Sequence, residues 1–338
     1  MSRRRILLQL AAGLAIAVTA LWLTYRSLDL DGLSGVLAGA DWAALLLVLP
    51  FLALSYVFRI MQWQVLLSPI RRVGFSCAAP PLLAGFMVNS IMPARLGEFV
   101  RALLLSRRTG VPRASSLATV ALSRVFDGLT LTAMSLGAVA AFWDTLDSPI
   151  RSGLMLAGAG YVALLAFVVA LWVWRGRACS LAVRPLRAAG FARAADGLER
   201  ILMSFAEGLA VLRSLRELAA VAALAVLVWA SLALSAAPVF LALSLPFRWY
   251  YPVLVLILAA FGMLVPTPAG TGTVHAALTA VMPALTVLST PQAGALALVF
   301  HASQFLPIIA AGIVAALHEG LRARDVVESG SDTGPPGH

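Results

Sequence analysis

The stretch Asn89–Arg101, which reads NSIMPARLGEFVR, decides the fold because a proline, a glycine and three charges interrupt an apolar run there. Pro80 and Pro81 on one side and Pro93 on the other leave about a dozen favourable helix positions, fewer than the roughly 20 that cross a bilayer. Pro93 and Gly97 favour a turn over a continuing helix. The stretch therefore predicts a broken helix at membrane depth.

A second stretch, Val265–Leu278 (VPTPAGTGTVHAAL), follows the same plan. When Pro93 is aligned with Pro268, both segments read Pro-Ala-x-x-Gly. Beyond each segment the likeness resumes, where Pro112, Ala114, Leu117, Ala118 and Val120 match Pro291, Ala293, Leu296, Ala297 and Val299. Chance explains some Ala and Leu identities in so Ala/Leu-rich a chain, but the shared prolines and glycine indicate an internal repeat.

The composition is that of an integral membrane protein. Hydrophobic residues make up 61% of the chain, charged residues 12%, and the mean hydropathy is +0.93. The net charge of +10 comes from arginine alone, since the sequence has no lysine. A basic membrane protein of this kind is expected to contact anionic inner-leaflet lipids, and nothing in the chain resembles a nucleic-acid-binding module.

The residues that could support catalysis or metal binding do not fall into a known pattern. Cys77 and Cys179 lie beside arginine-rich, cytoplasmic segments, where thiols stay reduced, so we expect neither a disulfide nor a metal site. No metal-ligand spacing, nucleophile elbow or phosphate-binding Walker loop occurs. We therefore predict that the chain is not an enzyme and takes no cofactor.

Apolar runs and arginine-rich loops together predict an orientation in the membrane. Full spans are expected at about 6–25, 42–67, 115–142, 150–174, 218–243 and 291–317. The first of these could instead be a signal peptide, but its length and the lack of a cleavage site favour an uncleaved helix. With arginine-rich loops in the cytoplasm, we predict a multi-pass protein of the cell (plasma or inner) membrane with both termini in the cytoplasm.

The shorter runs ending at Pro93 and Pro266 are predicted to turn back. A full crossing before Pro93 would place Arg101, Arg107, Arg108 and Arg113 outside, against the positive-inside bias. The fold class is then an all-α polytopic membrane protein with about six transmembrane helices and two re-entrant helical hairpins in an inverted repeat. We place repeat 1 at about 75–142 and repeat 2 at about 252–317, an arrangement typical of transporters, with the two breaks facing each other inside the protein.

One transmembrane domain is expected to cover residues 1–328, and a disordered tail to follow at 329–338. Within it, the arginine-rich segment 175–217 shows apolar residues at helical spacing from Leu198 onward. This pattern predicts an amphipathic helix that either lies on the inner leaflet or caps the bundle, or else an ordinary solvated connector.

The two breaks are the predicted binding site. Each exposes the N-terminal N–H groups of a half-helix, which attract phosphate, and Gly97, Gly270 and Gly272 would let the backbone approach it closely. Five ionisable residues at this depth are costly to bury and are predicted to serve the site, although ion pairs that merely hold the hairpin explain them too. They are Arg95, Glu98, Arg101, Arg124 and Asp127.

Other polar residues receive weaker predictions. Asn89 is expected to cap the turn rather than to donate to a phosphate. His275 and His301 are expected to be hydrogen-bonded core histidines, and a role in proton coupling stays open. Arg59 is expected to reach toward the interface from the inner end of its helix, as is Gln62.

At these motifs the chain resembles the flippase-like family named for the transmembrane region of lysylphosphatidylglycerol synthase. The matching residues are Asn89, Pro93, Arg95, Gly97, Glu98 and Arg101, then Leu117 to Arg124 with Asp127, then Pro266, Pro268, Gly270 and Gly272. The resemblance covers nearly the whole chain and implies that Arg95, Glu98, Arg101, Arg124 and Asp127 form a polar core. His275 stands where many members carry glutamate, and we expect no aminoacyltransferase domain after the last helix.

The sequence thus predicts translocation of an anionic lipid head group, of phospholipid or polyprenyl-phosphate type, through a midplane site between the hairpins. The lipid tails are expected to stay in the bilayer. The alternative is a non-transporting scaffold subunit for a lipid-synthesis or glycosyltransferase complex. Neither hypothesis excludes a homo-oligomer.

Overall fold

The computed structural model describes residues 3–26, 28–92, 96–141, 191–265 and 267–318, with single residues and short pieces between 152 and 188. The regular elements among these residues are all helices, with no strand. In chain order the helices are α1 (Arg3–Tyr25), α2 (Leu30–Ala38), η1 (Ala44–Leu47), α3 (Val48–Leu67), α4 (Phe75–Ile91), α5 (Gly97–Thr109), α6 (Arg113–Ala141), α9 (Ala192–Gly208), η3 (Ala210–Arg213), α10 (Leu215–Ala242), α11 (Tyr251–Gly262), η4 (Pro268–Gly270), α12 (Thr273–Leu285) and α13 (Thr290–His318).

Four of the described helices are long and apolar enough to cross a membrane: Ala44–Leu67, Arg113–Gly137, Leu215–Ala242 and Thr290–Leu317. They agree with four of the predicted spans, and α1 forms where the first span was predicted. The predicted span at about 150–174 lies largely outside the described residues, as does the predicted tail at 329–338. The chain is a multi-pass, all-helical membrane protein.

Each predicted break separates two short helices that pack against each other. The first lies between α4 and α5, and the second lies between α11 and α12, where η4 occupies part of the connection. A long helix follows each pair, α6 after the first and α13 after the second. The order short, short, long therefore occurs twice, as the internal repeat requires.

The prolines at the start of the first run behave differently from the prediction. Pro80 and Pro81 were expected to delimit the helix, but α4 begins at Phe75 and includes both. A proline removes the hydrogen bond to the residue four positions earlier, so only carbonyls in the first helical turn lose a partner here. The helix continues because membrane helices tolerate proline where neighbouring groups satisfy the freed backbone.

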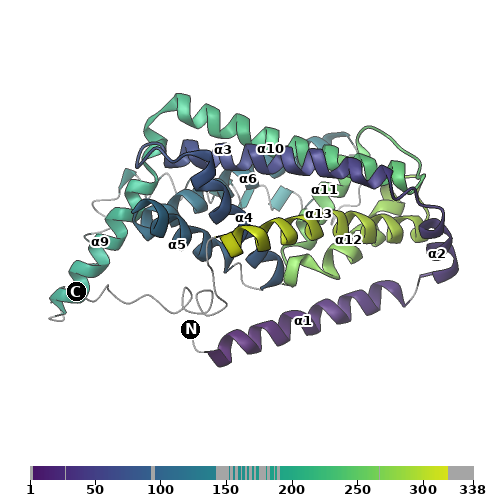
Figure 1. Ribbon diagram of the computed structural model, residues 1–338, viewed down its shortest axis with the longest axis horizontal. Coiled ribbons are helices and arrows are strands. Elements are labelled where there is room, and N and C mark those ends of the chain that lie inside the picture. Colours follow the sequence, from purple (N-terminus) through teal and green to yellow (C-terminus); the bar gives the residue numbers. More distant parts are fainter. Residues whose placement is uncertain are drawn as a thin grey trace.

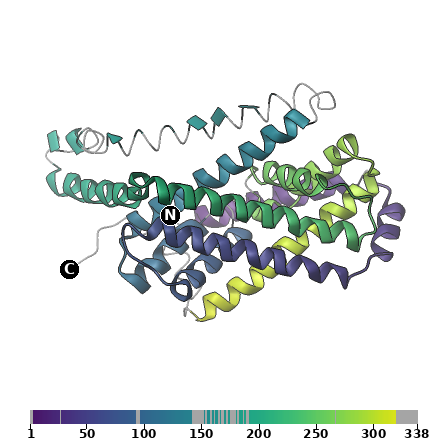
Figure 2. The same ribbon diagram turned by 90° about the horizontal axis from the view of Figure 1, so that it is seen from above.

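The two repeats form two hydrophobic clusters. The long helices α3 and α10 contribute residues to both clusters and run side by side in both ribbon views (Figures 1 and 2). One cluster includes Trp63 and Leu82 and lies among α3, α4, α6 and α10. The other includes Phe240 and Met282 and lies among α10, α11, α12 and α13. Because α13 also packs along α4, each repeat is in contact with the other.

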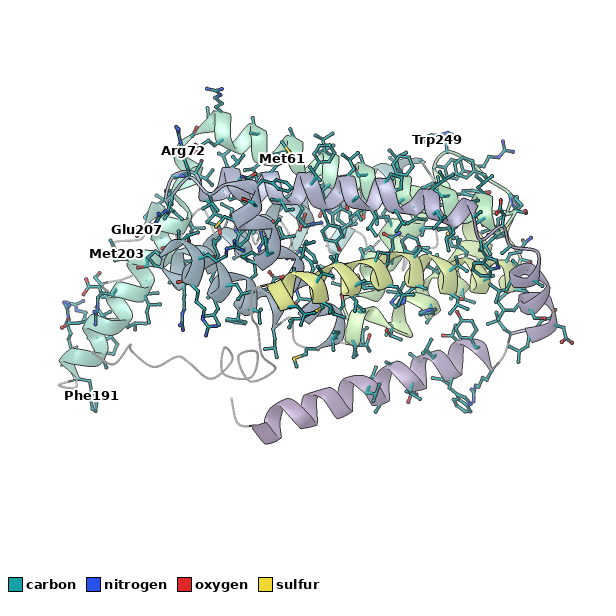
Figure 3. All side chains as sticks on the ribbon, viewed as in Figure 1. Met61, Arg72, Phe191, Met203, Glu207 and Trp249 are labelled. Carbon is teal, nitrogen blue, oxygen red and sulfur yellow. The ribbon has the colours of Figure 1, made fainter. Side chains whose placement is uncertain are left out.

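The outer surface is apolar, as a lipid-facing surface should be. Trp22 on α1 and Met61 on α3 are exposed, and α1 runs along one edge of the bundle, where it packs against α12 and η4 (Figure 3). Trp249, in the connection between α10 and α11, is 81% exposed and packs edge-on against Tyr250. Such rings are typical of membrane–water interfaces.

Helix α9 lies within the predicted amphipathic segment and caps one end of α6. The Ser115 hydroxyl donates to the Ser204 carbonyl at 2.7 Å, and Gly208 lies against Ser115 and Ala118. Met203 and Phe191 remain exposed on the other side (Figure 3). The contact with α6 agrees with the predicted helix that caps the bundle. The exposed residues show that part of its apolar surface is not covered by the described residues.

Candidate functional site

A cavity of about 710 Å³ lies between the two breaks. The first repeat contributes Asn89 and Met92 from one break and Glu98 from the start of α5. The second contributes Ala269 and Gly270, among others, from the other break. The two breaks therefore line one common cavity in the interior, and the long helices α3, α6, α10 and α13 complete its walls.

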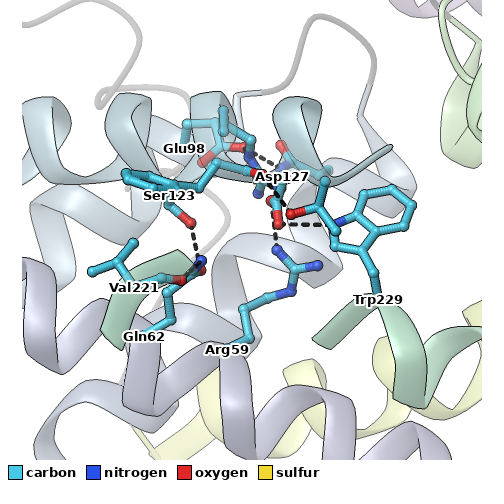
Figure 4. A network of polar contacts seen from close by, with 11 residues as sticks. Arg59, Gln62, Glu98, Ser123, Asp127, Val221 and Trp229 are labelled. Carbon is cyan, nitrogen blue, oxygen red and sulfur yellow. Dashed lines mark hydrogen bonds and ion pairs between the residues drawn. The ribbon is translucent and has the colours of Figure 1, made fainter. Parts of the chain in front are cut away.

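Asp127 of α6 is the centre of a buried polar network on the first side of this cavity (Figure 4). Its Oδ2 accepts from Arg59 Nη1 at 2.7 Å and from Arg124 Nη1 at 3.1 Å, while its Oδ1 accepts from the indole N–H of Trp229 at 3.1 Å. These donors come from α3, α6 and α10. A carboxylate at this depth is stable because charged or polar donors saturate it.

Glu98 of α5 connects this network to the first break. Its Oε1 accepts from Arg124 Nε at 2.9 Å and Arg124 Nη2 at 2.8 Å, and from the Asn89 amide at 3.3 Å. The Asn89 Oδ1 in turn accepts the backbone N–H of Gly97 at 2.8 Å. Asn89 thus caps the first turn of α5 and holds Glu98 in place at the same time.

The two cations beside Asp127 differ in exposure. The Arg59 residue is 6% exposed, whereas the Arg124 side chain is 29% exposed and faces the cavity. Arg124 uses three of its five N–H donors on Glu98 and Asp127, so up to two remain for a ligand. Both guanidinium groups lie near the face of Phe86, at 5.2 Å for Arg59 and 5.1 Å for Arg124.

The prediction that Arg59 and Gln62 reach toward the interface is wrong. Both are buried, and Gln62 joins α3 to its neighbours by accepting from Ser123 at 3.0 Å and donating to the Val221 carbonyl at 3.3 Å. Sequence reasoning also missed Trp229, which lies in an otherwise unremarkable apolar span. For Arg59 one signal was available, because Arg124 also pairs with Glu98 and Asp127 needed a second cation; no such signal pointed to the neutral indole of Trp229.

Of the two other predicted arginines, the structure describes Arg101 and places it apart from this network. Arg101 is 2% exposed and lies over the ring of Trp63, with its guanidinium carbon 3.7 Å from the ring centroid. Among the described residues its three guanidinium nitrogens have no hydrogen-bond partner, and it does not line the cavity. Arg95 lies outside the described residues.

The second break is shaped by backbone conformation and by imidazoles. Ala269, Gly270 and Gly272 have φ angles of 53°, 71° and 82°, in the left-handed region. His275 Nδ1 accepts the Gly272 N–H at 3.3 Å, and the His301 Nε2 lies 3.0 Å from the Ala269 carbonyl oxygen. Gly270 lines the cavity, while Gly272 and both histidines lie behind it.

The glycines also have a role other than the predicted one. A Cβ on Gly97 would lie 1.9 Å from the Gly85 carbonyl oxygen, and one on Gly272 would lie 2.5 Å from the carbonyl oxygen of Ala17. These positions therefore let α4 approach α5 and α1 approach the second break. Close helix packing therefore requires glycine at both positions, and the approach of a phosphate to them stays a prediction.

The arrangement can bind an amphipathic anion, with charged donors on one wall and apolar side chains on the other. Among the residues that the structure describes, no three His, Cys, Asp or Glu side chains gather as a metal site would require. The charges that are present pair with one another and leave part of Arg124 open to the cavity.

Two comparisons with known proteins bear on this site. The chain is 30% identical over 130 residues to "Glycosyltransferase AglD" of Haloferax volcanii, a match that covers 37% of this chain and 20% of that protein. The chain thus matches about a fifth of that relative's length. The family model described as the lysylphosphatidylglycerol synthase TM region matches residues 10–312. This protein therefore belongs to the lysylphosphatidylglycerol synthase TM region family.

Proposed function

We propose that the protein moves the head group of an anionic lipid between the two leaflets, and that the cavity between the breaks is the path. The observation that carries this proposal is the shared cavity. Arg124 lines it on one side, and the apolar residues Met263, Leu264 and Val265 line it on another. These three apolar residues are exposed. A phosphate at Arg124 and the first carbons of a lipid tail beside them would each meet a matching surface.

The membrane arrangement that fits this function has two re-entrant hairpins. Helices α4 and α11 are shorter than a full crossing and end at breaks that face the interior, so α5 and α12 would return to the side of entry. Both termini would lie in the cytoplasm. Under this topology the repeats are inverted, and closing one hairpin while the other opens would expose the cavity to each leaflet in turn.

Within the cavity, Arg124 is the proposed contact for the head group. Asp127 and Glu98 orient its guanidinium, and the remaining N–H donors form the planar fork that suits a phosphate. Arg95, which follows Pro93 in the first break, would add a second cation. Arg101 would contribute positive potential from behind Trp63 without touching the lipid. The protein would thus transport a lipid and not make or break its bonds.

Purified protein in liposomes tests the proposal, with labelled phosphatidylglycerol and a labelled polyprenyl phosphate as probes. The unmodified protein should accelerate movement of at least one of them across the bilayer. Arg124→Lys should lower that rate by about 10-fold to 150-fold, the equivalent of one charge-assisted hydrogen bond of about 1.5–3 kcal/mol. Arg248→Lys, a change at an exposed loop position, is the matched control and should leave the rate unchanged.

A scaffold function is the competing proposal, and the exposed apolar face of α9 favours it, as does the partial match to a protein named as a glycosyltransferase. The same liposomes separate the two. No acceleration for any anionic lipid, from protein that elutes as a single species, would reject transport and leave the scaffold. An unchanged rate in a well-folded Arg124→Ala variant would remove Arg124 from the mechanism.

A further inference from the structure

His275 of α12 and His301 of α13 together hold the second break from behind. His275 Nδ1 accepts the N–H of Gly272, and His301 Nε2 contacts the carbonyl oxygen of Ala269. The two rings are neighbours, with centroids 4.7 Å apart. One imidazole therefore contacts each end of the four-residue segment 269–272, which leads from η4 into α12.

The backbone of this segment adopts an unfavourable conformation that needs stabilising contacts. Ala269 has a φ of 53°, a conformation that non-glycine residues seldom adopt unless their surroundings impose it. Gly270 and Gly272 are left-handed as well, so the chain reverses over very few residues. The contacts of the two histidines to this backbone help to impose that shape, together with the Thr273 hydroxyl, which donates to the Gly270 carbonyl at 3.0 Å.

The hydrogen bond from Gly272 defines the protonation state of His275. An imidazole nitrogen can accept a hydrogen bond only while it carries no proton, so Nδ1 is bare and the ring is neutral. A second proton would convert Nδ1 into a donor that faces the N–H of Gly272. Protonation and the closed break are therefore mutually exclusive.

Among the described residues, no ion pair joins an acid to either imidazole. Tyr25 of α1 and His301 of α13 are the titratable side chains in ring contact with His275, and the Tyr25 hydroxyl donates to the Gly294 carbonyl. The sequences of α11, α12 and α13 contain no aspartate, glutamate or arginine, and neither does that of α4, which packs on α13 and η4. The remaining titratable group of α11, Tyr251, faces Phe240 and Tyr250.

We propose that the His275–His301 pair binds a proton and that this binding releases the second break. The closed break has no place for the added charge, so the proton binds more tightly to a conformation in which the segment has opened and water reaches the imidazoles. Ala269, Gly270 and Val274 line the cavity, and their movement changes its wall directly. The pair is thus a proton-binding site, which would couple proton movement to opening of the second hairpin.

Thiol labelling of the break tests this without any lipid substrate. The background is a variant in which Cys77 and Cys179 are replaced by serine and a cysteine is introduced at Thr271, which is half-buried. A small water-soluble thiol reagent is applied to purified protein from pH 8 to pH 5. The labelling rate at each pH is divided by the labelling rate of the same cysteine in a His275→Gln background. This division cancels the pH dependence that comes from ionisation of the thiol itself.

His275→Gln is the matched control because glutamine at this helical position can accept the same N–H yet takes up no proton in this pH range. The labelling ratio should rise as pH falls, by up to about tenfold per pH unit for the binding of one proton. His275→Ala, which lacks the acceptor, should label rapidly at every pH. His301→Gln, which retains a donor for Ala269, should reduce the pH dependence.

Two results would overturn the proposal. One is a labelling ratio that stays flat from pH 8 to pH 5, and the other is an equal pH dependence in a folded variant that carries both His275→Gln and His301→Gln. The experiment measures access of the reagent to the break and needs no lipid transport. A protein that moves no lipid would therefore still show whether labelling depends on pH. Failure of the transport proposal and failure of the proton proposal are therefore separate outcomes.

Discussion

The two breaks share one backbone plan but are held by different chemistry. At the first, Asn89 and Glu98 fix the start of α5, and ion pairs through Arg124 to Asp127 bind it to the long helices. At the second, left-handed residues and two imidazoles fix the start of α12, and the sequences of α11, α12 and α13 carry no acid or arginine. The cavity between them therefore has one charged wall and one apolar wall.

This difference shows how an internal repeat can specialise. The proline and glycine positions, which set where a helix can stop, are common to both copies. The side chains that stabilise the stop are not, since each copy uses the groups that its neighbouring helices can partner. One copy can then bind a charged group while the other packs against apolar surface or responds to a proton. The predictions below separate the two copies, from the largest expected effect to the smallest.

Asp127→Ala should be the most damaging change, because it leaves Arg59 buried without its carboxylate. Breaking a buried ion pair from one side costs about 3–5 kcal/mol of unfolding free energy. Denaturant unfolding in mixed micelles measures the loss. Arg187→Ala is the control, since it breaks exposed ion pairs with Asp196 and Glu199 and should cost less than about 1 kcal/mol. Equal losses in the two variants would show that the buried network adds nothing to stability.

Arg101→Met should act in the opposite direction and raise stability. Replacing buried charged groups with apolar side chains of similar volume is neutral or stabilising by about 1–4 kcal/mol, and Arg101 has no hydrogen-bond partner among the described residues. Arg59→Met, measured in the same micelles, should instead destabilise because it strips Asp127 of a donor. A loss of stability in Arg101→Met as large as that in Arg59→Met would contradict the distinction.

Gly97→Ala and Gly272→Ala should each destabilise by about 1–3 kcal/mol, because the added methyl group overlaps backbone atoms. The overlap at Gly97 is with α4 and that at Gly272 is with α1, where the left-handed φ adds strain. Thermal unfolding followed by circular dichroism compares them with Gly137→Ala, whose Cβ meets nothing within 4 Å. If all three variants unfold at the same temperature, close helix packing at the breaks does not contribute to stability.

Asn89→Ala should cost about 1 kcal/mol, the usual value of a side-chain cap at a helix N-terminus. The loss should appear locally, as faster hydrogen exchange of the first amides of α5 measured by mass spectrometry. Asn89→Asp keeps the acceptor for Gly97 but places a second carboxylate beside Glu98, so it should restore the protection only in part. Unchanged exchange in Asn89→Ala would mean that α5 begins without help from its cap.

Local sequence determined much of this molecule. Apolar runs of sufficient length located the long helices, because crossing hydrocarbon demands about 20 apolar residues. The Pro-Ala-x-x-Gly segments located both breaks, and the motif from Asn89 to Asp127 indicated the family. These properties depend on neighbours along the chain, so no knowledge of distant contacts was needed.

Tertiary structure alone decided which polar groups meet. Arg59 and Trp229 reach Asp127 from helices far away in sequence, and Arg101 turns toward Trp63 although it lies one turn from Glu98. The pairing of His275 with His301 likewise requires α12 and α13 to pack together. A buried charge needs partners in space, and many arrangements of the same helices would satisfy the same apolar pattern. Helix packing, which a single sequence does not reveal, selects one of them.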